Sequence, residues 1–162
     1  MKTILLIEDN LEILDNLKEF LEMENYCTHS ATCGKSGVKL AKNHQPDLII
    51  SDILLSDWDG FKVLKKLSKM DETKNIPFIF CSAQSEPKII KKGMKLGAVA
   101  YVIKPFDLDV LLETIKTHLD LNESGSRTNS VGLCSLLYPV TPLLYAGLSS
   151  NSGSFEGFQS YF

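Results

Sequence analysis

The polar side chains best suited to chemistry in this chain stand directly after short apolar runs. They are Glu8 and Asp9 after residues 4–7, Asp52 after 48–51, Ser82 after 78–81 and Lys104 after 101–103. Such runs are typical of buried parallel strands, and ligands of an open α/β sheet bind at the carboxyl ends of its strands. We therefore expect one pocket to hold three carboxylates, a hydroxyl and an ammonium group. Crowded carboxylates repel one another and burial adds to that cost, so the set predicts a Mg²⁺ site with a lysine on its rim.

Five alternations of strand and helix position these side chains. The predicted strands cover residues 3–7, 26–30, 48–51, 78–81 and 100–103. The predicted helices cover residues 10–23, 34–43, 61–70, 87–96 and 108–119. This alternation implies parallel pairing with right-handed crossovers, so residues 1–122 are expected to form a complete doubly wound α/β domain. The pattern alone does not give the strand order.

The composition is typical of a soluble globular protein. Of the 162 residues, 44% are hydrophobic and 23% are charged, and the net charge of −3 offers no basic excess for nucleic acid or an anionic membrane. The four cysteines and three histidines lack the spacing of zinc ligands. Unpaired thiols in a small α/β domain favour a reducing cytoplasm. The first apolar run is too short for the core of a signal peptide.

The composition changes after residue 122. Residues 123–162 hold only three charged residues, and Ser- and Gly-rich flanks surround an uncharged stretch at 131–148. We expect an irregular tail that is disordered or loosely packed and contains no folded output module. The uncharged stretch lies at the lower limit for a membrane span, but Pro139 and Pro142 argue against tethering to a membrane.

Four motifs occur in a fixed order along residues 1–122. They are Ile7-Glu8-Asp9-Asn10, Asp52-Ile53-Leu54-Leu55 with Asp59-Gly60 after it, Cys81-Ser82-Ala83, and Tyr101-Val102-Ile103-Lys104-Pro105-Phe106. Together, and at this spacing, they resemble the receiver domain of two-component response regulators over about three quarters of the chain. The resemblance implies a flavodoxin-like parallel sheet of strand order 2-1-3-4-5 with five helices.

The resemblance also implies a phosphorylation site. Asp52 would accept a phosphoryl group from a phosphohistidine on a histidine kinase or a histidine phosphotransfer protein. Glu8, Asp9, Asp52 and the backbone carbonyl of Leu54 would hold Mg²⁺, with Glu8 often acting through a water in this family. Water and a phosphoryl oxygen would complete the octahedral coordination.

The remaining matched residues carry implied roles around that site. Lys104 would neutralise a phosphoryl oxygen, and the Lys104–Pro105 bond matches the cis peptide of the family. Ser82 would donate its hydroxyl to the phosphoryl group and move toward it after transfer. Tyr101 would then fill the vacated space and carry the change to the surface formed by the last two helices and the last strand, as a two-state switch.

Purely structural interpretations remain open for single residues. Asp9 and Asp59 could be helix N-caps, and Tyr101 could simply pack on the sheet. We expect Leu11 to be exposed, at a position where a kinase or phosphotransfer helix would dock. Lys91, Lys92 and Lys95 make helix 87–96 basic, which is first a solvated face and only second a docking surface.

The leading hypothesis is a response regulator receiver that catalyses its own Mg²⁺-dependent phosphorylation and signals through an unidentified downstream protein, without turning over external substrates. One alternative is a receiver-like scaffold that binds partners without phosphorylation. Another is a Mg²⁺-dependent hydrolase with an aspartyl-phosphate intermediate. Such hydrolases usually carry a second acid two residues after the nucleophile, and Leu54 occupies that position here.

Overall fold

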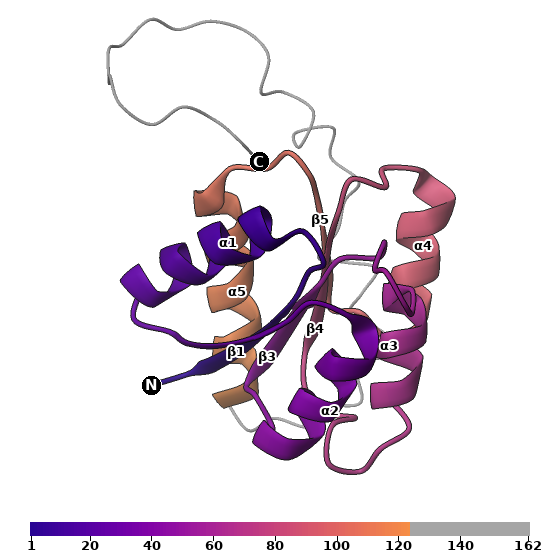
Figure 1. Ribbon diagram of the computed structural model, residues 1–162, viewed down its shortest axis with the longest axis horizontal. Coiled ribbons are helices and arrows are strands. Elements are labelled where there is room, and N and C mark those ends of the chain that lie inside the picture. The colour runs from indigo at the N-terminus through magenta and orange to yellow at the C-terminus, as the bar shows by residue number, and fades with distance from the viewer. Residues whose placement is uncertain (124–162) are drawn as a thin grey trace, which may run out of the picture. The chain divides into compact units, whose positions relative to one another are not determined.

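Five parallel strands form the sheet in the order β2-β1-β3-β4-β5 (Figure 1). They are β1 (Thr3–Ile7), β2 (Cys27–Ala31), β3 (Leu48–Ser51), β4 (Phe78–Ser82) and β5 (Ala100–Ile103). The helices are α1 (Leu11–Met23), α2 (Gly34–His44), α3 (Gly60–Leu67), α4 (Pro87–Lys95) and α5 (Leu108–Glu123). This arrangement confirms the predicted flavodoxin-like topology. The computed structural model describes residues 1–123, and all of the predicted tail except Glu123 lies outside them.

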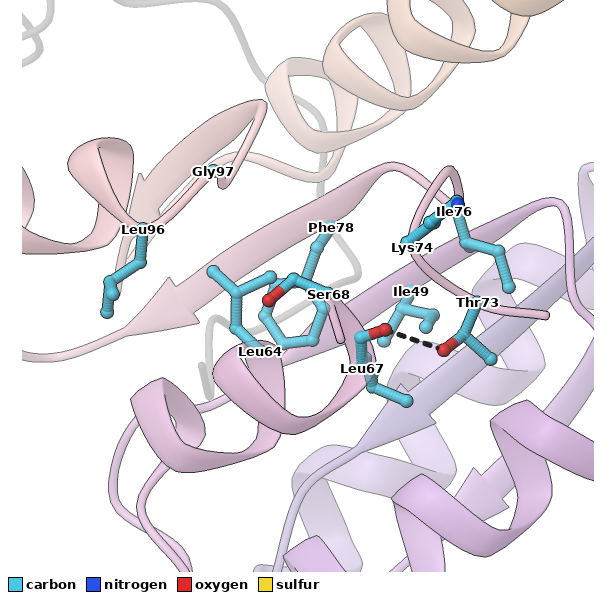
Figure 2. A pocket seen from close by; sticks show the side chains of 10 residues that line it. All are labelled: Ile49, Leu64, Leu67, Ser68, Thr73, Lys74, Ile76, Phe78, Leu96 and Gly97. Atoms are coloured by element: carbon cyan, nitrogen blue, oxygen red, sulfur yellow. Dashed lines mark hydrogen bonds between the residues drawn. The ribbon is translucent and has the colours of Figure 1, made fainter. Parts of the chain in front are cut away.

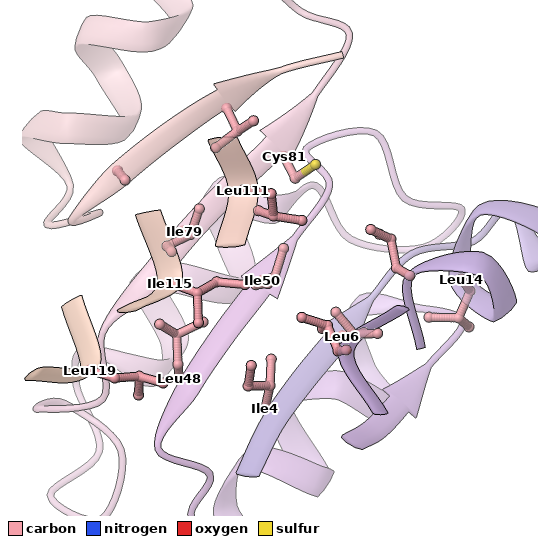
Figure 3. Packing of buried hydrophobic residues seen from close by; sticks show 14 residues of the cluster. Ile4, Leu6, Leu14, Leu48, Ile50, Ile79, Cys81, Leu111, Ile115 and Leu119 are labelled. Atoms are coloured by element: carbon pink, nitrogen blue, oxygen red, sulfur yellow. The ribbon is translucent and has the colours of Figure 1, made fainter. Parts of the chain in front are cut away.

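Helices cover both faces of the sheet because the strand side chains are buried on both sides. Successive residues of a strand point to opposite faces. Leu6, Ile50 and Ile79 pack with Leu111 and Ile115 of α5 and with the buried side of α1 (Figure 3). The alternate residues of the strands pack against α2, α3 and α4 on the other face. The sheet thereby presents the carboxyl ends of all its strands at one edge.

Two helix starts settle the open question about capping. Asn10 caps α1, since its side-chain oxygen accepts hydrogen bonds from the amides of Glu12 at 3.0 Å and Ile13 at 3.3 Å. The interpretation of Asp9 as the N-cap of this helix is therefore wrong. Asp59 does cap α3, as expected, with its carboxylate 2.7 Å from the amide of Lys62.

Element boundaries differ from the sequence predictions by a few residues. α3 ends at Leu67 rather than at residue 70, because the hydroxyl of Thr73 donates to the Leu67 carbonyl at 2.8 Å and a series of turns follows. Strand β2 begins at Cys27, one residue later than predicted, because Cys27 is the first residue of β2 that pairs with β1, opposite Thr3. α5 extends to Glu123 instead of 119. None of the helices in residues 1–123 has the length and apolarity that crossing a membrane requires.

Candidate functional site

The ends of β1 and β3 lie next to each other, which brings two of the predicted acids together. These strands pair with Ile7 opposite Ser51, so Glu8 and Asp52 each follow the last paired residue of adjacent strands. The Asp52 amide extends the pairing by donating to the Ile7 carbonyl at 2.9 Å. The two carboxylates therefore reach the same edge although 44 positions separate them in the sequence.

Lys104 bridges these two carboxylates. Its Nζ lies 2.5 Å from Glu8 Oε2 and 3.0 Å from Asp52 Oδ2. The side chains are nearly buried, with 10% of Lys104, 6% of Glu8 and 11% of Asp52 exposed. The Lys104 amide donates to the Ser82 carbonyl at 3.0 Å, and the Lys104–Pro105 peptide is cis, as predicted. One amine thus holds the ends of β1, β3 and β5 together.

Burial and charge perturb this triad. Burial raises the pKa of Glu8, and the nearby charge of Asp52 adds to the rise, while Lys104 only partly offsets it. Burial alone would lower the pKa of Lys104, but the hydrogen bond to Glu8 and the surrounding negative groups raise it instead. Lys104 is therefore firmly protonated, and the cluster keeps a formal charge of −1 when both acids are ionised.

The Asp52 carboxylate presents its two oxygens to different partners. Oδ1 accepts hydrogen bonds from the backbone amides of Ile53 at 2.5 Å and Leu54 at 3.1 Å. Oδ2 faces Lys104. The backbone of the β3–α3 loop therefore orients one oxygen, and the other points into the charged cluster.

The donor chemistry of this edge fits a small divalent cation. Within residues 1–123, no three Cys, His, Asp or Glu side chains lie close enough to bind a metal by themselves, and Lys104 Nζ lies between Glu8 and Asp52. Asp9 follows Glu8 in the chain and is exposed. Carboxylate oxygens with an excess of negative charge suit Mg²⁺, which keeps several of its waters.

Ser82 and Tyr101 meet at the loop after β4. Ser82 is fully buried at the end of that strand, and its hydroxyl oxygen lies 3.5 Å from the amide of Gln84. The Tyr101 hydroxyl donates to the Gln84 carbonyl at 2.6 Å, and its ring lies 5.9 Å from that of Phe80. Burial, together with the charge of Asp52, raises the pKa of Tyr101 to about 12. The tyrosine is therefore a neutral donor that holds this loop.

Known proteins share both this sequence pattern and this fold. Residues 4–116 match the response regulator receiver domain. The chain belongs to this family. Sporulation initiation phosphotransferase F of Bacillus subtilis is 31% identical over 121 residues, which cover 75% of this chain and 96% of that protein. The polar-differentiation response regulator DivK of Brucella anthropi is 33% identical over 121 residues, with coverage of 73% and 96%.

A solved structure supports the same assignment. The CheY-like response regulator receiver domain protein of Methanospirillum hungatei has a TM-score of 0.73 and 31% identity to this chain. The match covers 78% of this chain and 99% of that one.

Sequence reasoning missed the role of Asp57 in this receiver. α2 begins after Cys33, whose side chain makes no capping bond. Asp57 of the β3–α3 loop supplies the cap instead, accepting from the amides of Gly34 at 2.7 Å and Lys35 at 3.1 Å. These bonds lower the pKa of Asp57, although the amide of its neighbour Trp58 contributes more. The poor cap at Cys33 was the only signal in the sequence.

Gly60 is the second constraint on this loop. A Cβ at this position would collide with the backbone carbonyl oxygen of Asp52. This close approach of the backbone requires glycine at position 60. Asp57 and Gly60 together fix the segment that carries Asp52.

One pocket in residues 1–123 lies away from this cluster. Its volume is about 100 Å³. Figure 2 shows its walls, which include Leu64, Leu67 and Ser68 from the end of α3, and Leu96 and Gly97 after α4. Phe78, the first residue of β4, also lines it, so the pocket lies at the amino-terminal end of the strand. The charged cluster lies at the opposite ends of the strands.

Proposed function

We propose that Asp52 accepts a phosphoryl group from a phosphohistidine of a histidine kinase or histidine phosphotransfer protein. The bridge from Lys104 to Glu8 and Asp52 is the single observation that carries this proposal. An amine shared by two nearly buried acids neutralises charge where a phosphoryl group would arrive, and phosphoryl transfer depends mainly on positioning and charge neutralisation.

Asp52, Lys104 and Ser82 have separate roles in the transfer. The N–P bond of the phosphohistidine breaks as an oxygen of Asp52 forms the new O–P bond, and the imidazole nitrogen recovers a proton. Asp52 Oδ2 is the attacking oxygen, since Oδ1 accepts two backbone hydrogen bonds. Lys104 pairs with a phosphoryl oxygen in place of Asp52, and Ser82 donates its hydroxyl to another.

Glu8, Asp9, Asp52 and the backbone carbonyl of Leu54 would hold Mg²⁺ in this proposal. When bound, the ion supplies charge neutralisation for the phosphoryl oxygens and for the crowded carboxylates. The rise in the pKa of Glu8 that burial and the charge of Asp52 cause supports this assignment, since a cation would relieve both effects.

Signalling follows from a switch in protein binding. Tyr101 would lose its bond to the Gln84 carbonyl when Ser82 moves toward the phosphoryl group, because both contact the same loop. The proposed output is an altered affinity for a downstream protein, with no direct binding of nucleic acid. Leu11, 62% exposed at the start of α1 and close in sequence to Asp9, is the proposed contact for the phosphodonor protein.

The proposed domain is residues 1–122, with residues 123–162 as an appended tail that has no part in transfer. A cytoplasmic location accords with the proposed kinase partner. A phosphorylation-independent scaffold and an aspartyl-phosphate hydrolase are not favoured, because the acids and lysine are assembled and Leu54 offers no second acid.

Intact-mass measurement tests the proposal. The full chain is incubated with acetyl phosphate and Mg²⁺, beside Asp52→Asn and, as a matched control, Asp71→Asn at an exposed site. Wild type and Asp71→Asn should each gain one phosphate. Neither should gain it when Mg²⁺ is chelated before acetyl phosphate is added. An adduct that persists in Asp52→Asn would defeat the assignment, and steady turnover of a phosphomonoester would favour the hydrolase.

A further inference from the structure

Eight exposed lysines cover α3 and α4. Half of the chain's lysines therefore lie on two short segments that contain no acidic residue. They are Lys62, Lys65, Lys66 and Lys69 on α3 and the turn after it, and Lys88, Lys91, Lys92 and Lys95 on α4. In both segments the lysines recur at i, i+3, i+4 and i+7, a spacing that places side chains on one side of a helix. We name these eight residues the lysine face.

The lysine face costs stability in the isolated protein. Like charges at i and i+4 on a helix destabilise it. α4 holds two such pairs and α3 holds one, with Lys69 in the turn that follows α3. No residue of the face has an ion pair with a described acid. Elsewhere in residues 1–123, Lys2, Lys18, Lys42, Lys74 and Lys104 each lie within 4.0 Å of a carboxylate. Five of the eight lysines outside the face are thus paired with an acid, whereas none of the eight within it is paired with a described acid.

α3 and α4 form one continuous surface. The Lys92 Nζ lies 4.0 Å from the centre of the Phe61 ring, which links α4 directly to α3. Lys62 lies 4.5 Å from the ring of Trp58. The ring faces attract the ammonium groups and restrict their positions. Two of the cations are therefore held in place before any partner arrives.

A small pocket with both apolar and polar walls opens beside the same pair of helices. The cavity of about 100 Å³ is lined by Leu64, Leu67 and Ser68 on the α3 side and by Leu96 and Gly97 on the α4 side (Figure 2). Residues of the loop before β4, among them Thr73, Lys74 and Ile76, also line it. Lys69 follows Ser68 in the sequence and Lys65 precedes it by about one helical turn. Lys92 and Lys95 occupy the last turn of α4 before Leu96. Its volume suits one aliphatic side chain, since a cavity of about 150 Å³ admits benzene. Positive charge and a recess with several aliphatic walls therefore occur together beside α3 and α4.

We propose that the lysine face binds an acidic helix of a separate protein, with one aliphatic side chain of that helix in the pocket. Acidic residues at helical spacing would pair with Lys65 and Lys69 on one side and with Lys92 and Lys95 on the other. Such a helix in a groove is an established mode of peptide recognition. The proposal uses no residue of the phosphorylation site and extends beyond the function proposed above.

Other occupants fit these observations less well. Membrane binding needs exposed apolar anchors, and none of the large exposed hydrophobic residues of the described chain lies on α3 or α4. Nucleic acid offers no aliphatic group for the pocket, and the face contains no arginine. α1 of a second copy carries exposed Glu12, Asp15, Glu19 and Glu22, but α1 packs on the opposite side of the sheet. That contact would be head-to-tail and would not close into a dimer.

Fluorescence anisotropy tests the proposal with the unphosphorylated full chain. The probe is a labelled synthetic helix-forming peptide of about 18 residues, with glutamates at i, i+3, i+4 and i+7 and one central leucine. Replacing Lys65, Lys69, Lys92 and Lys95 by Gln should weaken its binding about tenfold or more, and 0.5 M salt should do the same. The matched control replaces Lys35 and Lys39, exposed on α2, and should change affinity less than about twofold.

The contribution of the pocket to peptide binding is tested separately. Ser68→Phe should fill the recess, and a peptide with alanine in place of its leucine should lose the same affinity, about fivefold. Peptide binding that neither change weakens, or that the control variant loses equally, would overturn the proposal. It would also fail if duplex DNA or anionic vesicles bound the lysine face more tightly than the peptide, or if the chain self-associated through it. The proposal is also overturned if the peptide does not bind at low ionic strength.

Discussion

Replacing Lys104 by methionine tests the bridge that organises the site. The amine lies 2.5 Å from Glu8 Oε2 and 3.0 Å from Asp52 Oδ2, and all three side chains are nearly buried. Loss of the shared cation leaves two carboxylates facing each other, and breaking a buried ion pair in this way costs about 3–5 kcal/mol. Protonation of Glu8 would remove one of the two facing charges. Protonating a glutamate of ordinary pKa at pH 7 requires about 3.7 kcal/mol, so the cost of losing the bridge has an upper limit near this value. We expect Lys104→Met to lower the free energy of unfolding by about 3 kcal/mol at pH 7.

The pH dependence of this loss has a definite sign. Without its counter-ion, Glu8 should have a folded-state pKa even further above its ordinary value than in the wild type, where burial already raises it. An acid with a raised folded-state pKa stabilises the fold fully below its ordinary pKa and loses that contribution as the pH rises through the folded-state value. The gap between the two proteins should therefore shrink by up to about 1.4 kcal/mol per pH unit between neutral pH and about pH 5.

Urea denaturation followed by circular dichroism at several pH values measures this gap. The matched control is Lys116→Met, which removes an exposed lysine from α5 and should cost less than about 0.5 kcal/mol at every pH. Equal losses in the two variants, or a Lys104→Met loss that does not change with pH, would refute the buried bridge. All measurements are made without Mg²⁺, because a bound cation would mask the repulsion.

Three further outcomes are expected. Asp57→Ala removes the cap of α2 and should cost about 1–2 kcal/mol in urea denaturation. Asp71→Ala, in an exposed ion pair, should cost clearly less, and equal losses would contradict the capping role. Gly60→Ala introduces a clash with the backbone of the β3–α3 loop. It should lower the free energy of unfolding by about 1–3 kcal/mol and slow phosphorylation by acetyl phosphate, and a variant with wild-type rates would disprove the clash. Burial raises the pKa of Cys81 to about 12, so iodoacetamide at pH 8 should modify exposed Cys27 and reach Cys81 only after unfolding, as peptide mapping would show.

Much of the site was predictable because parallel strands share a direction. Glu8, Asp52 and Lys104 each follow an apolar run, and the carboxyl ends of parallel strands meet at one edge. Their assembly therefore needed only the positions of the strands. The strand order came from the resemblance to the receiver family, since a pattern of alternating strands and helices is compatible with several orders.

Other features depended on contacts between elements that the sequence pattern does not relate. Asp57 caps a helix that begins 23 residues earlier, and a turn sequence does not indicate which helix it will approach. The same limit applies to the lysine face, whose two stripes join only because α3 and α4 pack side by side through Phe61 and Lys92. Local periodicity encodes where each strand and helix lies, because it reflects burial along one element. Which elements become neighbours follows from the packing of the whole sheet, and those neighbours determine the caps, the pocket and the extent of the basic surface.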